Sequence, residues 1–157
     1  MSHPHRYRVD VEWTGNRGSG TDGYRSYGRD HVIRIDGKPA LAGSADPTFH
    51  GDAARHNPED MLVSALSTCH LLSYLHMASV AGVVVTAYTD AAEGTMATEG
   101  DAGRFIEVVL HPVVTISAAS DPAKAAAAHD TAHHACFIAN SVNFPVRCEP
   151  RILIASV

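Results

Sequence analysis

The sequence predicts one α+β domain over residues 1–157, because strand patterns and helix patterns occupy separate stretches of the chain. Short stretches with a two-residue hydrophobic period occur at the start and in the second half, whereas a long stretch with helical spacing follows Asn57. Apolar residues make up 45% of the chain and charged residues 18%. This balance, at this length, is typical of a single globular domain.

The first third of the chain is expected to form β-hairpins. Tyr7–Trp13 alternates apolar and polar residues, which predicts a half-buried strand. His31–Ile35 predicts a second strand, and Asp36-Gly37 predicts a type I′ turn from which residues 38–41 return. A connection rich in Gly, Pro and Asp follows over residues 43–56.

A long helix is the clearest element. Asn57 is a favourable N-cap, Pro58 suits the first helical position, and Gly82 predicts an end near Val80. Between them, residues at helical spacing are Met61, Leu62, Ala65, Leu66, Cys69, Leu72 and Leu75. Such a helix measures roughly 35 Å. We therefore expect it to run through the centre of the domain and to gain from burial against a second copy.

The second half predicts further strands and one more helix. Val83–Tyr88 is a strand, and residues 105–116 hold one or two more, broken near His111-Pro112. Asp121-Pro122 opens an alanine-rich helix. A last strand is expected over Val146–Ile154, where Pro150 indicates an edge or a bulge.

Charge and hydropathy argue against several classes of function. The net charge is −5 without a basic cluster, so nucleic acid is not an expected partner. Met1–Arg6 lacks the apolar run of a secretory signal. The apolar stretch Met61–Val85 is interrupted by His70 and His76, which favours a buried helix and a strand over a membrane span. We expect a cytoplasmic protein without a membrane partner.

The three cysteines are Cys69 in the long helix, Cys136 late in the second helix and Cys148 in the last strand. In a reducing cytosol, cysteines are more often free, metal-bound or redox-active than joined in structural disulfides. The plain alternative for each is a core residue, because cysteine packs as a small hydrophobe. We interpret Cys148 as structural.

The segment Asn57–His70 resembles the helix motif of the osmotically inducible protein C / organic hydroperoxide resistance (OsmC/Ohr) family. That motif reads Asn-Pro-Glu, a run of small and apolar residues, and then Cys, which is Cys69 here. A cysteine late in a second helix is the other family signature, and Cys136 matches its position. The order of elements and the total length match as well.

The resemblance implies an α+β fold in which antiparallel β-sheets wrap around two long helices of an intertwined homodimer. It also implies a thiol peroxidase active against organic or small hydroperoxides in oxidative-stress defence. Cys69 would attack the peroxide and become a sulfenic acid, and Cys136 would resolve it as a disulfide. A dithiol reductant would complete the cycle, with no metal or organic cofactor.

In the family, an arginine held by a glutamate activates the attacking thiol, and Glu59 matches the glutamate. Glu59 lies roughly 15 Å along the helix from Cys69, so it cannot serve the cysteine of its own chain. Antiparallel crossing of two copies near Ser64 would bring them level, which favours a two-chain site. The arginine is expected to be Arg17, with Arg55 as the alternative.

Two positions depart from the family pattern. The stretch Pro47-Thr48-Phe49-His50 lacks the arginine that some members carry there, and Phe137 replaces a common proline after the second cysteine. The simpler interpretation of Arg17 is an exposed arginine in a loop. The simpler interpretation of Glu59 is an acidic residue in the first helical turn, where the helix dipole favours a negative charge.

Two other classes of function stay open. In one, the same dimer is a non-catalytic protein that binds a small hydrophobic ligand, with inert cysteines. In the other, His129, His133 and Cys136 bind a transition metal, since they share a helix face. A solvated histidine face is the preferred interpretation of that spacing. His76, seven residues after Cys69, is read as a core histidine.

Overall fold

The structure, a computed structural model, describes residues 4–100 and 102–156. Met1–His3 lies outside the described residues. It is part of the stretch that was interpreted as lacking a secretory signal. The chain divides into two compact units, Met1–Met61 and Leu62–Val157. The division falls in the first turn of the long helix, and the two units are described separately.

The first unit holds a three-stranded antiparallel sheet in the order β1-β2-β3, followed by the short 3-10 helix η1. The bounds are β1 Asp10–Trp13, β2 His31–Arg34, β3 Leu41–Gly43 and η1 Pro47–Phe49. The prediction of a half-buried first strand is wrong, because every residue of β1 is exposed. The prediction of a type I′ turn at Asp36-Gly37 is also wrong. Gly37 takes a positive φ of 72° but Asp36 does not, and type I′ requires both.

The first unit contains no buried apolar side chain among its described residues. Its buried positions are Gly15, Gly28, Gly43 and Ser44. Gly15 lies against Gly28, and a Cβ on Gly15 would stand 2.0 Å from the Gly28 carbonyl oxygen. The Ser44 hydroxyl donates to Asp30 at 3.0 Å and accepts from the Asp52 N–H at 3.1 Å. Backbone contacts and polar bonds, not an apolar core, hold this unit together.

The long helix α1 spans Pro58–Val80, as predicted. Asn57 caps it, since its side-chain oxygen accepts from the Asp60 N–H at 2.7 Å. Gly82 takes φ 74°, and the Val83 N–H returns to the Ala78 carbonyl at 2.9 Å. This is the hydrogen-bond pattern of a glycine-terminated helix.

The buried face of α1 differs from the predicted one. The structure buries Leu66, His70, Tyr74 and Ala78, whereas Leu72 is 67% exposed. The description of α1 as a buried helix is therefore wrong for a single chain. Its apolar residues occur on several sides, so periodicity alone could not select the face. Among the described residues, α1 is also the one helix long and apolar enough to cross a membrane, and 22% of its apolar window is buried.

The second unit contains two three-stranded sheets in the orders β4-β7-β9 and β5-β6-β8. Their bounds are β4 Val85–Asp90, β5 Glu93–Glu99, β6 Ala102–Leu110, β7 Pro112–Ile116, β8 Val146–Cys148 and β9 Arg151–Ile154. The pairs β4–β7 and β5–β6 are antiparallel, but β6–β8 and β7–β9 are parallel. The sheets are therefore mixed, not purely antiparallel.

Two prolines mark where the chain passes from one sheet to the other. The predicted break at His111-Pro112 separates β6 from β7, and Pro150 separates β8 from β9. The Glu149 N–H donates to the Leu110 carbonyl at 2.8 Å and holds the two crossings together. Proline lacks the N–H that a continuing ladder needs, so the strands end there.

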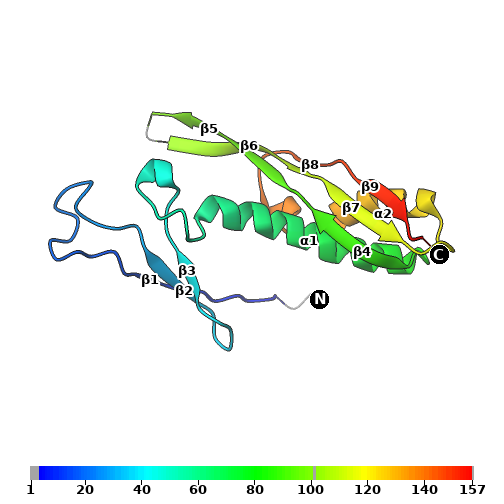
Figure 1. The fold of residues 1–157 in the computed structure, drawn as a ribbon, viewed down its shortest axis with the longest axis horizontal. Helices are drawn as coiled ribbons and strands as arrows, with labels where there is room; N and C mark the ends of the chain where they lie inside the picture. Colours follow the sequence, from blue (N-terminus) through cyan, green and yellow to red (C-terminus); the bar gives the residue numbers. More distant parts are fainter. Residues whose placement is uncertain (1–3, 101, 157) are drawn as a thin grey trace. The chain divides into compact units, whose positions relative to one another are not determined.

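The second helix, α2, spans Pro122–Ala135, and Asp121 caps it by accepting from the Ala123 N–H at 2.8 Å. In Figure 1, α1 and α2 lie along the strands of the second unit. Tyr74 and Ala78 of α1 pack with the β7 strand and with small alanines of α2, which allow close approach. A second apolar cluster gathers around Leu66. The predicted α+β class is confirmed.

Candidate functional site

The side chains of Cys69 and Cys136 are neighbours, close enough for Cys69 to raise the pKa of Cys136. Cys69 lies in the middle of α1, and Cys136 is the C-cap of α2, 67 residues later. All three cysteines are free thiols. Two thiols held side by side can form a disulfide after one of them has been oxidised. The structure thus brings together the two cysteines that the resemblance to the family indicated.

The end of α2 fixes the position of Cys136. Its N–H donates to the His133 carbonyl at 3.2 Å, and the Ala139 N–H points at its sulfur at 3.5 Å. The Asn140 side chain donates to the His134 carbonyl at 2.9 Å and satisfies one of the last carbonyls of the helix. Phe137, which replaces the common family proline, is 78% exposed and lies outside the core.

The two thiols differ in accessibility and in chemistry. Cys136 is 1% exposed, whereas Cys69 is partly exposed. Burial, together with the neighbouring Cys69, raises the pKa of Cys136 to about 11, although the Ala139 amide opposes the shift. Cys136 is therefore a neutral thiol at pH 7, and Cys69 is the more exposed residue of the two.

The cysteine pair borders an apolar cluster. Leu66, one turn before His70 on α1, packs with Val108 and Leu110 of β6. Ile138 and Ala139, which directly follow the second cysteine, pack against the same cluster. Leu66, Val108 and Leu110 are almost fully buried, so this cluster is part of the core that supports the segment after Cys136.

Arg17 and Glu59 belong to the first unit. Arg17 lies in an exposed loop, and its Nη2 atom is 3.6 Å from where a Cβ on Gly28 would stand. Glu59 is in the first turn of α1, as predicted. Within the described part of the chain, neither forms an ion pair. Because the cysteines lie in the second unit, the roles of Arg17 and Glu59 stay predictions.

Arg55, the alternative arginine, is held by two carboxylates. Its guanidinium lies 3.3 Å from Asp52 and 3.8 Å from Asp30. Asp30 in turn accepts from the buried Ser44 hydroxyl. Arg55 therefore has a structural role in the connection that precedes α1, which favours Arg17 as the arginine available for a thiolate.

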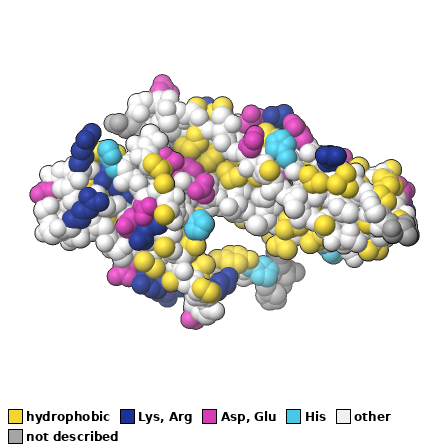
Figure 2. Space-filling model, viewed as in Figure 1, with side chains coloured by type: hydrophobic (Ala, Val, Ile, Leu, Met, Phe, Trp, Pro, Cys, Tyr) yellow, Lys and Arg dark blue, Asp and Glu magenta, His cyan; other side chains and the backbone are white. Residues whose placement is uncertain are grey.

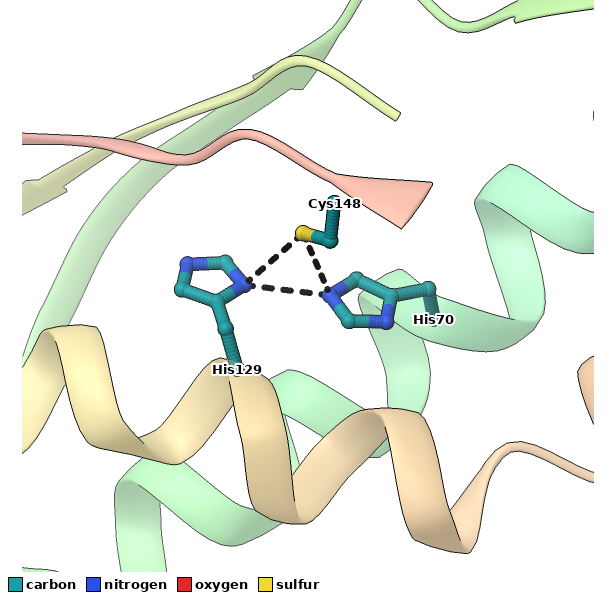
Figure 3. Close-up of side chains that lie close together, drawn as sticks. All are labelled: His70, His129 and Cys148. Atoms are coloured by element: carbon teal, nitrogen blue, oxygen red, sulfur yellow. Dashed lines mark hydrogen bonds between the residues drawn. The ribbon is translucent and has the colours of Figure 1, made fainter. Parts of the chain in front are cut away.

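A second cluster was not foreseen from the sequence. His70, His129 and Cys148 face one another in the second unit, and both histidines are buried (Figure 3). The prediction that His129 lies on a solvated helix face is therefore wrong. The three residues considered as metal ligands from the sequence, His129, His133 and Cys136, do not come together as a ligand set. His76, read as a core histidine, is exposed. His70 lies four residues from both Leu66 and Tyr74 in α1, and this helical spacing was the available signal.

Burial sets the protonation of this cluster. Burial lowers the pKa of His70, and it lowers that of His129 to about 4, so both rings are neutral at pH 7. Burial and the nearby Asp90, Asp130 and Glu149 charges raise the pKa of Cys148 to about 12. Without a cation, the cluster consists of two neutral imidazoles and a neutral thiol.

The family model of OsmC-like proteins matches residues 50–151, well over half of the chain. The chain belongs to the OsmC-like family. An OsmC-like protein of unknown function from Vibrio cholerae is 32% identical and superposes with a TM-score of 0.84, covering 94% of this chain and 99% of that one. The family expected from the Asn57–Cys69 motif is therefore confirmed.

More distant OsmC-like structures share the fold. An organic hydroperoxide resistance protein from Elizabethkingia anophelis superposes with a TM-score of 0.70 at 14% identity, covering 99% of this chain and 100% of that one. One from Legionella pneumophila gives 0.68 at 16% identity, covering 97% and 99%. No curated protein matches the chain.

Proposed function

We propose that this OsmC-like protein reduces hydroperoxides with Cys69 and Cys136 as its redox pair, in defence against oxidative stress. The proximity of the two cysteine side chains, which come from the middle of α1 and the end of α2, is the observation that carries the proposal. Family membership and the neighbours named organic hydroperoxide resistance proteins point to the same class of activity.

The reaction has three balanced steps. The Cys69 thiolate attacks the outer peroxide oxygen, the O–O bond breaks, and an alcohol leaves after taking up a proton. The resulting Cys69 sulfenic acid then condenses with the Cys136 thiol, which forms the disulfide and releases water. A dithiol reductant finally exchanges with the disulfide and restores both thiols.

The unequal exposure of the two cysteines supports this division of roles. The attacking sulfur has to meet a peroxide, and Cys69 is partly exposed. The resolving sulfur needs only to reach its neighbour, and Cys136 is buried beside it.

The expected product of the first two steps is a Cys69–Cys136 disulfide. One equivalent of an organic hydroperoxide, followed by alkylation and peptide mass spectrometry, should give this crosslink as the major species and leave Cys148 alkylated only after unfolding. Catalytic peroxide consumption with a dithiol should accompany it. If neither crosslink nor consumption occurs, the non-catalytic hydrophobic-ligand protein becomes the better interpretation.

We also propose that the protein is a homodimer in the cytoplasm. The first unit has no buried apolar side chain among its described residues, and α1 exposes Leu72, Leu75 and Val80. Apolar side chains reach the surface over the region of α1 and β4 in the second unit (Figure 2). A second copy that covers these surfaces would bury the apolar side chains that one chain leaves exposed.

Light scattering should therefore give twice the 16.7 kDa chain mass at micromolar concentration. Leu72→Glu should shift the mass toward the monomer, because it would place a charge among apolar side chains in the dimer. A stable, folded and active monomer of the unaltered chain would contradict the dimer. Association only with lipid vesicles would instead assign the apolar face of α1 to a membrane.

A further inference from the structure

Three metal-ligating atoms converge in the second unit. The His70 Nε2 and His129 Nδ1 atoms are 3.0 Å apart, and the Cys148 sulfur lies 3.5 Å from the first and 3.7 Å from the second. The residues come from α1, α2 and β8, and Figure 3 shows their side chains pointing at a common centre. Their separation along the chain, up to 78 residues, makes this a product of the fold.

The triangle has the size that a tetrahedral zinc ion needs. With Zn–N bonds of about 2.0–2.1 Å and a Zn–S bond of about 2.3 Å, ligand atoms stand about 3.3 Å (N to N) and about 3.6 Å (N to S) apart. The observed edges of 3.0, 3.5 and 3.7 Å lie close to these values. The ion would enter with small side-chain movements only.

The surroundings also suit a cation. Both imidazoles are neutral and offer lone pairs. Asp90, Asp130 and Glu149 are close enough for their negative charges to act on Cys148, and the same field attracts a positive ion. Tyr74 stacks on His129 with ring centroids 3.9 Å apart and fixes the orientation of that ring.

A hydrogen-bonded cluster is the alternative, and it leaves polar atoms unsatisfied. One hydrogen can join the two facing nitrogens, and the thiol can supply another. The outward nitrogens, His70 Nδ1 and His129 Nε2, are buried without a partner among the described residues. In this form one outward nitrogen carries a buried N–H without an acceptor. A metal ion on the two facing nitrogens places an N–H on both outward nitrogens, and its three coordinate bonds have to offset that cost.

We propose that His70, His129 and Cys148 bind a transition-metal ion, with Zn²⁺ as the best match to two imidazoles and one thiolate. Cys148 loses its proton to the solvent when the ion binds. Three protein ligands leave a fourth position for water or a small ligand. The site shares no residue with the Cys69–Cys136 pair, although His70 directly follows Cys69, and it ties α1, α2 and β8 together.

Cobalt(II) provides the test, because a thiolate bound to Co²⁺ gives a near-ultraviolet charge-transfer band that imidazole and carboxylate ligands do not give. The chain with Cys69→Ser and Cys136→Ser keeps Cys148 as its one thiol. After removal of metals with a chelator, this protein should bind one Co²⁺ per chain with the band, and Zn²⁺ should displace it. Zn²⁺ should also raise the melting temperature by several degrees.

Adding Cys148→Ser should remove the band, whereas adding His76→Gln, an exposed histidine on the same helix, should keep it. Circular dichroism verifies that each variant is folded. Binding without the band, or a band that survives Cys148→Ser, would overturn the site and indicate surface histidines. Failure to bind any stoichiometric Co²⁺ would overturn it as well. Because the test protein lacks the proposed redox pair, its result is independent of peroxidase activity.

Discussion

Cys69→Ser should abolish peroxide turnover, whereas Cys136→Ser should consume one equivalent and then stop. A serine hydroxyl is a poor nucleophile at neutral pH without a base, so the first variant lacks the attacking group. The second variant keeps the attacking thiol but cannot form the disulfide, so its sulfenic acid accumulates or oxidises further. The measurement is peroxide consumption with a dithiol, together with the intact mass of each protein.

The loss in Cys69→Ser should be catalytic and not structural. Cys69 is partly exposed and the substitution is nearly isosteric, so its melting temperature should stay close to that of the unaltered chain. The mass of oxidised Cys136→Ser should increase by one or two oxygen atoms at Cys69. If Cys136→Ser turns over normally while Cys148→Ser does not, the resolving role belongs to Cys148 and the assignment is wrong.

Arg17→Ala should slow peroxide reduction by about a hundredfold, the order of effect of removing one charge-stabilising donor from an active site. A guanidinium favours the thiolate form of a nearby cysteine, and it can donate several hydrogen bonds to a peroxide from a fixed plane. Because Arg17 is exposed and forms no ion pair within the described residues, its loss should change stability by less than about 0.5 kcal/mol. Stopped-flow peroxide reduction and thermal melting measure the two effects.

Arg55→Ala is the matched control. The Arg55 guanidinium is already engaged by Asp52 and Asp30, so its removal should affect the melting temperature more than the rate. Glu59→Ala should reduce the rate in the same direction as Arg17→Ala but less, if the carboxylate holds the arginine by paired hydrogen bonds. A rate loss in Arg55→Ala without one in Arg17→Ala would transfer the activating role to Arg55.

Local signals determined the ends of the helices and one strand break. Asn57, Pro58 and Gly82 set the limits of α1, and Asp121-Pro122 set the start of α2. These residues act on backbone groups within four positions of themselves, so no distant contact is needed to read them. The motif ending at Cys69 likewise lies within one helix, and it was enough to predict the family.

Interpretations that depended on a distant neighbour were less successful. Strand β5 was missed, because Glu93–Glu99 is polar, exposed along its whole length and held by pairing with β6. The stripe through Leu72 and Leu75 was expected to be buried, and the fold instead buries His70 and Tyr74. An apolar helix can present several faces, and the elements packed against it decide which one enters the core.

The sequence by itself therefore determined the α+β class, the limits of α1 and the start of α2, and its resemblance to the family indicated the two cysteines proposed as a redox pair. The tertiary structure alone decided that β6 and β8 pair in parallel, that Arg55 is engaged by Asp30, and that His70 and His129 meet Cys148. Capping and turn preferences are local, so the residue types near a helix end or a turn reveal them in the sequence. A contact between residues 59 or 78 positions apart requires no particular residue types nearby, because it depends on the packing of α1, α2 and β8 as whole elements.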